Sequence, residues 1–350
     1  MINFFFIFLI LILLNIKLKA QDGNFQEYER GYMRLLFYNT ENLFDIFDDS
    51  TKTDEDFTPE GDKYWNNNRY YKKLNNISKV ITAVGQWDAP DIIGLCEVEN
   101  RFVLEGITKK TKLKKYDYRI IHYESSDNRG IDVGLLYRKD RFTPISYEPI
   151  HIRFVNDGNK PTRDILYVVG YNNNKDTLHI FINHWPSRWG GQMETDDKRR
   201  YVADILRKKV DSLFVAEINP KIVIMGDLND YPDNSSLLEH LKIQTSFENI
   251  KDEDLYSLAY YLQFTKGKGS HKHEATWGVL DQIIVSGSLL NVNNKLHTTK
   301  DDAHVFDAPF LLEPDDVYTG YKSFRTYIGF KFNDGFSDHL PVYLDLWKKE

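Results

Sequence analysis

The sequence predicts a single globular domain that combines buried β-strands with amphipathic α-helices. Short apolar runs recur along the chain, and each ends on polar or turn-forming residues, as strands of a protein core do. Two longer segments, residues 64–84 and 195–216, place apolar side chains on a helical period. The 350 residues contain no long Pro/Gly/Ser linker and no internal repeat, which favours one domain over two.

The N-terminus has the pattern of an export signal. Residues 4–14 form an unbroken apolar run, and Leu18-Lys19-Ala20 is an acceptable cleavage site. The run is short for a transmembrane helix, so we predict a signal peptide over residues 1–20 and a mature domain over residues 21–350. An uncleaved membrane anchor is the alternative, because no Lys or Arg precedes the run. The predicted location is secreted or periplasmic, with no stable membrane contact after cleavage.

Charge and composition limit the possible binding modes. The formal net charge of −7 provides no global positive field, so a phosphate-bearing substrate must be met by local cations or a bound metal. The most basic stretch, residues 109–115, is interpreted as a solvated helix face rather than a phosphate-binding patch. The acidic residues 45–60 lack calcium-loop spacing, which favours a solvated loop. Cys96, the single cysteine, is predicted to be a buried structural thiol.

Polar side chains suited to metal binding or acid–base chemistry occur where apolar strands end. The strand over residues 222–225 is followed by Asp227 and Asn229, which lie on one side of an extended chain. A second pair, Asp338 and His339, precedes the strand over residues 342–346. The complete set is Asn39, Glu97, His184, Asp227, Asn229, Asp338 and His339, with Asp281 just before the strand over residues 283–285.

This set of side chains is suited to metal-assisted hydrolysis. Taken alone, each residue has a structural explanation, and Glu97, for example, could be a salt-bridged carboxylate at the rim of a sheet. Together they supply two imidazoles, four carboxylates and two amides. Oxygen ligands without a cysteine or histidine cluster favour Mg²⁺ or Mn²⁺ over Zn²⁺. The sequence contains no Gly-rich phosphate loop, G-x-S-x-G elbow or Rossmann fingerprint.

The pattern resembles the endonuclease/exonuclease/phosphatase superfamily of deoxyribonuclease-I-like hydrolases, in its secreted bacterial branch. The resemblance extends from about residue 33 to residue 346, and six ordered motifs carry it: Tyr38-Asn39-Thr40-Glu41-Asn42, Gly94-Leu95-Cys96-Glu97, Asn183-His184-Trp185-Pro186-Ser187, Gly226-Asp227-Leu228-Asn229, Leu280-Asp281-Gln282-Ile283 and Ser337-Asp338-His339-Leu340-Pro341. It implies an α+β fold, a four-layer α/β/β/α sandwich in which two mixed β-sheets face each other.

The resemblance also implies residues that hold the metal and the substrate. Glu97 is expected to be the principal metal carboxylate, with Asn39 beside it. Asp338 is expected to hold the metal or to orient its water molecules. Arg163 matches an arginine that contacts the substrate phosphate, and we expect Arg188 to contact the substrate as well.

Five further residues are expected to act in catalysis. His184 matches the histidine of the deoxyribonuclease-I and phosphatase branches and would be the general acid on the leaving oxygen. His339 would contact the phosphate, with Asp281 accepting its other ring proton. Asp227 would orient or deprotonate the attacking water, and Asn229 would hydrogen-bond a phosphoryl oxygen.

We therefore expect a secreted, monomeric phosphodiesterase that depends on Mg²⁺ or Mn²⁺ and acts as an endonuclease on nucleic acid. The alternative is a phosphatase or phospholipase-type phosphodiesterase with an inositol phosphate or a sphingomyelin-like substrate. A third possibility is a non-catalytic binding protein on the same scaffold, which the intact set of polar residues disfavours.

Overall fold

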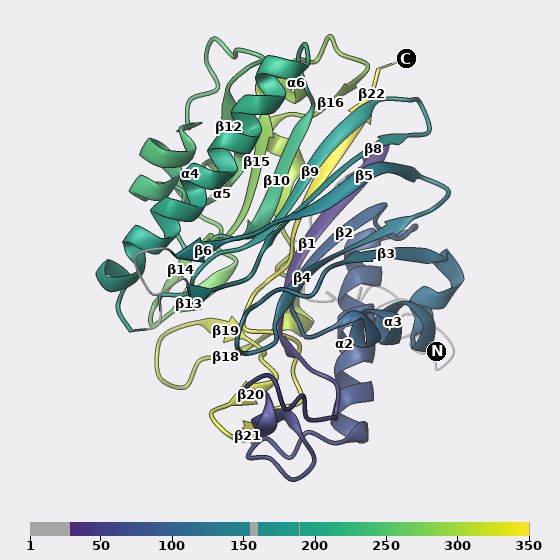
Figure 1. The fold of residues 1–350 in the computed structure, drawn as a ribbon, viewed down its shortest axis with the longest axis vertical. Helices are drawn as coiled ribbons and strands as arrows, with labels where there is room; N and C mark the ends of the chain where they lie inside the picture. Colours follow the sequence, from purple (N-terminus) through teal and green to yellow (C-terminus); the bar gives the residue numbers. More distant parts are fainter. Residues whose placement is uncertain (1–28, 155–159, 189, 350) are drawn as a thin grey trace, which may run out of the picture.

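Two seven-stranded mixed β-sheets face each other at the centre of the fold (Figure 1). This computed structural model describes residues 29–154, 160–188 and 190–349, so the predicted signal peptide lies outside the described residues. The first sheet contains, in spatial order, β16 (Leu296–His297), β22 (Val342–Lys348), β1 (Met33–Leu43), β2 (Ile92–Val98), β4 (Asp132–Arg138) and β3 (Tyr118–His122), with β17 (Ala303–Val305) also paired to β22. The second contains β11 (Ile243–Gln244), β12 (Leu255–Ser257), β15 (Asp281–Ser286), β10 (Ile222–Asp227), β9 (Thr177–His184), β8 (Ile165–Asn172) and β5 (Phe142–Ile150).

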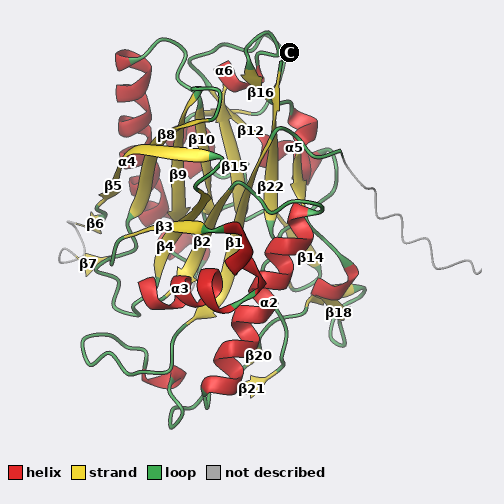
Figure 2. Cartoon of the chain, turned by 90° about the vertical axis from the view of Figure 1, so that its right-hand side faces the viewer, coloured by secondary structure: helices red, strands yellow, loops and turns green. Residues whose placement is uncertain are grey.

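Helices cover the outer faces of both sheets, which confirms the predicted four-layer α/β/β/α sandwich. The helices α2 (Asn67–Gly85) and α3 (Arg101–Lys110) lie over the first sheet, and α4 (Gln192–Ala216) lies over the second (Figure 2). The side chains of β10 alternate between the two faces of its sheet, so one face packs on the other sheet and the opposite face packs on a helix. Val223 and Met225 belong to the core between the sheets, whereas Ile222 and Ile224 pack with apolar side chains of α4.

The predicted helices are present, with shifted starts. The second begins at Gln192, three residues before the predicted position, and ends at Ala216 as predicted. The first begins at Asn67 instead of residue 64, because the Asn66 side chain accepts hydrogen bonds from the backbone N–H groups of Asn68 and Arg69. Its predicted apolar residues are fully buried: Leu74, Ile77, Ile81 and Val84.

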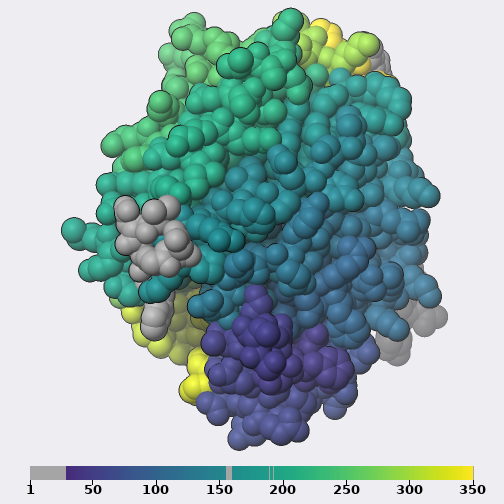
Figure 3. Space-filling model, in the orientation of Figure 1, coloured from purple at the N-terminus to yellow at the C-terminus, as the bar shows by residue number. Residues whose placement is uncertain are grey.

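The long C-terminal region forms small hairpins. One pairs β18 (Leu312–Pro314) with β19 (Tyr321–Ser323), and another pairs β20 (Tyr327–Ile328) with β21 (Lys331–Phe332). The second hairpin packs on the acidic loop through the rings of Tyr327 and Phe57, whose centroids lie 6.4 Å apart. The Tyr327 hydroxyl also donates to the carbonyl of Lys63, just after that loop, at 2.9 Å. Figure 3 shows these purple and yellow segments meeting at the base of the molecule.

Shorter elements complete the described chain. They are α5 (Leu258–Phe264), α6 (Gly287–Leu290), the paired strands β6 (Arg153–Phe154) and β7 (Lys160–Pro161), the paired strands β13 (His271–His273) and β14 (Thr276–Gly278), and the single turns η1 (Glu55–Phe57), η2 (Lys112–Tyr116), η4 (Ser236–Leu241), η5 (Lys300–Asp302) and η6 (Pro309–Leu311). None of the helices in the described part of the chain combines the length and apolar character that a bilayer span requires.

The structure also shows how exposed Cys96, the acidic loop and the basic stretch are. Cys96 is fully buried. In the acidic loop Asp48, Asp49, Glu55 and Asp56 are exposed, as expected of a solvated loop, whereas Asp45 and Asp54 are buried, because both accept hydrogen bonds within the protein. The basic stretch covers the end of α3 and η2, and its lysines at 109, 110, 112, 114 and 115 are exposed. The basic stretch leads into β3, whose first residue lies across the sheet from the start of β2. Glu97 is near the other end of β2, so the basic stretch and Glu97 lie at opposite ends of the sheet.

Candidate active site

Strand register brings the predicted residues together at one end of the two sheets. In the second sheet, Asp227 is paired with His184 on one side and with Asp281 on the other. In the first sheet, β1 and β2 run parallel, with Asn39 paired to Cys96 just before Glu97. The two sheets meet here, because the Asn39 Nδ2 donates to Asp227 Oδ2 at 3.0 Å and lies 3.3 Å from Glu97 Oε1.

Unusual backbone conformations occur at this end of the sheets. Glu97 has φ = 57° at an irregularity in the pairing of β2 with β4, and Asn229 has φ = 51°. Non-glycine residues rarely adopt this left-handed region, and its cost is tolerated where the surroundings enforce it, often at functional sites. Here the Glu97 carboxylate is held by the backbone N–H of Asn42, which donates to Oε2 at 2.9 Å.

Two imidazoles face the Asp227 carboxylate. The Nε2 atom of His339 lies 3.7 Å from Asp227 Oδ2, and that of His184 lies 3.9 Å from the same oxygen. His184 Nε2 is also 3.8 Å from Glu97 Oε1. On its other side, His339 Nδ1 lies 2.7 Å from Asp281 Oδ2, a contact that fixes the ring orientation and keeps the proton on Nδ1.

The two histidines differ in their proton affinity. Burial, with the guanidinium groups of Arg163 and Arg129, holds the pKa of His184 well below its usual range. Burial alone would also lower the pKa of His339, but Asp281 and Asp227 raise it well above the usual range. His184 is therefore neutral before substrate binds, and a general-acid role requires it to take up a proton together with the anionic substrate.

The donor set fits a hard divalent cation. The carboxylates of Glu97 and Asp227 converge on Asn39 Nδ2, which donates to them and is not itself a ligand atom. Burial raises the pKa of Asp227 to about 7 because charge here is poorly solvated. The buried Oδ1 atom of Asp281 has no hydrogen-bond partner among the described residues. Oxygen ligands of this kind are those that Mg²⁺ and Mn²⁺ prefer.

The predicted metal ligands have additional protein contacts. Asn39 Oδ1 accepts the backbone N–H of Glu41 at 2.9 Å, so Nδ2 is the atom that faces the carboxylates. Asp338 Oδ2 accepts from the Arg325 guanidinium at 3.0 Å. The loop that carries Asp338 is fixed to β1 by Ser337, whose hydroxyl donates to the Asn39 carbonyl at 2.8 Å.

A network of buried and half-buried side chains beside the site was missed by the sequence analysis. Arg325 donates to Glu41 at 3.0 Å as well as to Asp338, and Glu41 also accepts the Thr326 backbone N–H at 2.6 Å. Lys73 on α2 donates to the Phe336 carbonyl at 2.6 Å and to the Thr326 hydroxyl. Burial lowers the pKa of Lys73 to about 8, although Glu41 opposes that shift. The only available signal was the place of Glu41 in the first motif.

His271 is a second omission. Its ring lies 4.7 Å from the His339 ring between centroids, and ligand atoms of His271, Asp338 and His339 all fall within 4.8 Å of one another. The short strand β13 brings His271 there by pairing with His339 in an isolated bridge. Nothing in the local sequence around His271 marks it, because it does not follow an apolar strand.

The remaining predicted residues lie near the loop after β10. The Asn229 side chain donates to the Trp185 carbonyl at 3.1 Å, and its backbone N–H donates to Asp227 Oδ1 at 2.9 Å. Arg188 donates to the Asn229 carbonyl at 2.7 Å and contacts Asp230 at 3.1 Å, so it braces this loop. Its role in substrate binding stays a prediction.

Comparisons with known proteins agree with this architecture. Residues 34–348 match the model of the "Endonuclease/Exonuclease/phosphatase family". No curated protein matches the chain. Three similar solved structures are humanized TDP2 of D. rerio (12% identity, 90% of this chain and 98% of that chain, TM-score 0.55), the human Nocturnin catalytic domain (15%, 91% and 94%, 0.53) and the mannosyl-6-phosphatase Bt3783 of Bacteroides thetaiotaomicron (14%, 90% and 99%, 0.53). At these identities the likeness concerns the fold.

Proposed function

Since the chain belongs to the endonuclease/exonuclease/phosphatase family, whose members are metal-dependent phosphoesterases, we propose that it is a secreted, monomeric phosphodiesterase acting on nucleic acid. The observation that carries the proposal is the convergence of two imidazoles on one buried carboxylate. His184 and His339 both lie within 4 Å of Asp227, at 3.9 and 3.7 Å. Hydrolysis of a phosphodiester requires one proton to leave the attacking water and another to reach the leaving oxygen, and this arrangement offers groups for both.

The metal would be held by Glu97 and Asp338 with Asn39 beside them, and it would be Mg²⁺ or Mn²⁺. When bound, such a cation neutralises negative charge that develops on the phosphate in the transition state. Asp227 lies between the two histidines and the Asn39 amide, which suits it to orient or deprotonate water.

The residues around Asp227 would then bind the phosphate and supply a proton. His339, oriented by Asp281, would contact a phosphoryl oxygen. Asn229 would hydrogen-bond another phosphoryl oxygen, while His184 would protonate the leaving group after substrate binding has raised its pKa. Arg163, whose guanidinium donates to the Trp185 carbonyl next to His184, would contact the substrate phosphate.

A small phosphoester is the second candidate substrate. The net charge of −7 disfavours a long polyanion, and the similar Bacteroides protein is by its printed name a mannosyl-6-phosphatase. An inositol phosphate or a sphingomyelin-like head group would use the same catalytic residues, so only a direct comparison of substrates distinguishes the two.

The test is hydrolysis of single-stranded DNA, duplex DNA, RNA, an inositol phosphate and sphingomyelin with Mg²⁺ or Mn²⁺ and with EDTA. We expect cleavage of nucleic acid that EDTA abolishes, and a loss of roughly 10²-fold or more in Glu97→Gln because a charged group at the reacting phosphate is removed. Glu148→Gln, the same charge change at an exposed position of β5, is the control. Cleavage that persists in EDTA, or full activity of Glu97→Gln, would exclude the metal site, and turnover of small esters alone would exclude the nuclease.

A further inference from the structure

An arginine from the C-terminal part of the chain lies at the edge of the candidate active site. Arg325 stands between β19 and β20, and its guanidinium bridges two carboxylates. Its Nε atom donates to Glu41 Oε1 at 3.0 Å, and its Nη2 atom donates to Asp338 Oδ2 at 3.0 Å. Asp338 is a predicted metal ligand and directly precedes His339, which is expected to contact the phosphate. The guanidinium therefore lies next to the place at which we expect the reacting phosphate.

The backbone on both sides of Arg325 is held by hydrogen bonds. The N–H of Phe324 donates to the Leu311 carbonyl at 2.8 Å. The N–H of Thr326 donates to the buried Glu41 carboxylate at 2.6 Å. Because this backbone and two of the guanidinium nitrogens are already fixed, the side chain loses little further conformational entropy when it binds a ligand.

Arg325 keeps a surface that a substrate can reach. Its side chain is 43% exposed, although two of its nitrogens bind carboxylates. Its third nitrogen, Nη1, has no hydrogen-bond partner among the described residues. By comparison, Arg163 is 6% exposed and donates from both Nη atoms to acceptors of the protein. Arg325 therefore offers more donor surface to a phosphate than the arginine expected from the sequence.

The positive charge of Arg325 acts across the candidate metal site. Burial alone would lower the pKa of Arg325, but Asp338, Glu41 and Glu97 raise it above its usual range. Glu97 is the expected principal metal carboxylate, so the guanidinium is within electrostatic range of that site. Lys73 is buried beside Glu41 and shares the charge of that carboxylate. Part of the Arg325 charge is therefore available to a bound anion.

We propose that Arg325 is a substrate-binding residue whose Nη1 atom donates to a phosphoryl oxygen of the reacting phosphate, on the Asp338 side of the site. The inference rests on the proposed function and adds to it a residue that no sequence motif marks. A planar guanidinium suits this role, because it can hold two carboxylates through Nε and Nη2 and still donate from Nη1. The contact strengthens as negative charge develops on the phosphate, so Arg325 acts on kcat as well as on binding.

The first test replaces Arg325 by Met, which removes the charge, and by Lys, which keeps the charge without the planar fork. On the substrate that the wild type cleaves best, we expect kcat/KM to fall about 10²-fold in Arg325→Met and about tenfold in Arg325→Lys. Arg119→Met is the matched control. Arg119 is 49% exposed, pairs with Asp117 at 3.0 Å and lies at the end of the first sheet opposite Glu97. Wild-type kcat/KM in Arg325→Met would overturn the proposal, whereas Arg119→Met should keep it.

Arg325→Met should remain folded, because each carboxylate keeps another stabilising contact. Glu41 keeps the N–H of Thr326 and the nearby Lys73. The Asp338 side chain is 24% exposed, so water can replace the lost donor. Urea unfolding checks this, and if Arg325→Met does not fold, Arg325→Lys decides the test by the same comparison with Arg119→Met.

A binding measurement separates substrate binding from a purely positioning role. Inorganic phosphate is titrated calorimetrically into the protein in Mg²⁺, and Mg²⁺ is titrated alone. We expect Arg325→Met to bind phosphate about tenfold more weakly than Arg119→Met does. It should bind Mg²⁺ at least as tightly, because loss of a nearby positive charge does not weaken the binding of a cation. Weaker Mg²⁺ binding with unchanged phosphate binding would mean that Arg325 only positions Asp338, and would refute the proposed contact.

Failure of this proposal and failure of the proposed function give different results. Phosphate binding that depends on Arg325, in a protein without phosphodiesterase activity, would support the contact and refute the enzyme. Hydrolysis that depends on Glu97 but not on Arg325 would support the enzyme and refute the contact. A wild-type protein that binds no inorganic phosphate would also contradict the role of Arg325.

Discussion

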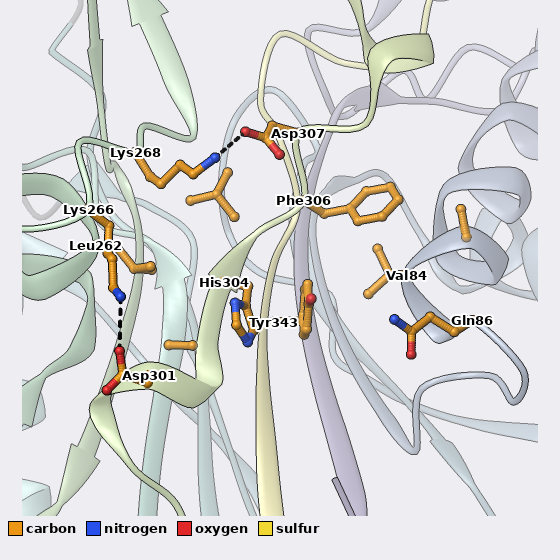
Figure 4. A pocket seen from close by; sticks show the side chains of 13 residues that line it. Val84, Gln86, Leu262, Lys266, Lys268, Asp301, His304, Phe306, Asp307 and Tyr343 are labelled. Carbon is orange, nitrogen blue, oxygen red and sulfur yellow. Dashed lines mark hydrogen bonds and ion pairs between the residues drawn. The ribbon is translucent and has the colours of Figure 1, made fainter. Parts of the chain in front are cut away.

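Buried ionisable side chains are the most informative individual residues of this protein. In the candidate site, His184 and His339 both lie close to the Asp227 carboxylate. The surroundings of His184 lower its pKa, whereas those of His339 raise its pKa. Lys73 is buried beside Glu41 and donates to the Thr326 hydroxyl and the Phe336 carbonyl. Outside the candidate site, His304 shows the effect of burial at a residue that is not among the predicted metal ligands. Its ring lies 4.8 Å from that of Tyr343 (Figure 4).

His304 should make the protein less stable in mild acid. Burial, reinforced by Arg34, lowers its pKa to about 4 against the opposing Asp302, while the unfolded chain has the usual value near 6.5. Between these values only the unfolded chain binds the proton, so stability is lost as the pH falls from about 6.5 towards 4. We expect His304→Gln to remove on the order of 2 kcal/mol of the loss in unfolding free energy between pH values of about 7 and 4.5, measured in urea. The same pH dependence in the variant and the wild type would contradict this assignment.

At the level of elements, strand pairing explains how residues distant in sequence meet. The antiparallel pairing of β1 with β22 places the last motif beside the first, and the parallel pairing of β9 with β10 aligns His184 with Asp227. One ion pair ties β1, β22 and α2 together. Arg34 donates to both carboxylate oxygens of Asp345, at 2.8 and 2.6 Å, and to the Val84 carbonyl at 2.5 Å, with both charged side chains buried.

Breaking this ion pair should cost much stability. Asp345→Ala leaves the Arg34 guanidinium buried without its counter-ion, and we expect the unfolding free energy in urea to fall by about 3–5 kcal/mol. The double variant Arg34→Met/Asp345→Leu removes both charges and should recover most of that loss. A double variant that is no more stable than Asp345→Ala would contradict this explanation.

At the level of the whole molecule, the two sheets hold an oxygen-rich site between them. The site residues come from both sheets, so a cation bound there would connect the two halves of the sandwich. A ligand that binds only the folded state stabilises it in proportion to the logarithm of its concentration.

Mg²⁺ or Mn²⁺ should therefore raise the melting temperature even without substrate. At a concentration about 100 times the dissociation constant, the gain is about 2.7 kcal/mol, which corresponds to a shift of several degrees. Glu97→Gln should abolish most of this shift, and Glu148→Gln should keep it. Identical shifts in the two variants, measured by calorimetry, would mean that the cation binds elsewhere.

Much of the fold and the site could be predicted from local pattern. Apolar runs marked the strands, and a polar residue directly after each run marked Asn39, Glu97 and His184, because the end of a buried strand is where a polar side chain can reach solvent. The start of α2 differed from the predicted residue 64, because a helix begins where a side chain such as that of Asn66 caps its first N–H groups and not where the apolar pattern begins.

The sequence by itself thus determined which residue types stand at the strand ends, and hence the family, the fold class and the class of chemistry. Only the tertiary structure decided which of those groups touch and what else joins them. Arg325 meets Glu41 across 284 positions of the chain, and Arg163 meets Trp185 across 22, in contacts that no local period encodes. The proton states of His184 and His339 were decided in the same way. A pKa depends on burial and on charges brought near through space, and both arise only when the two sheets close on each other.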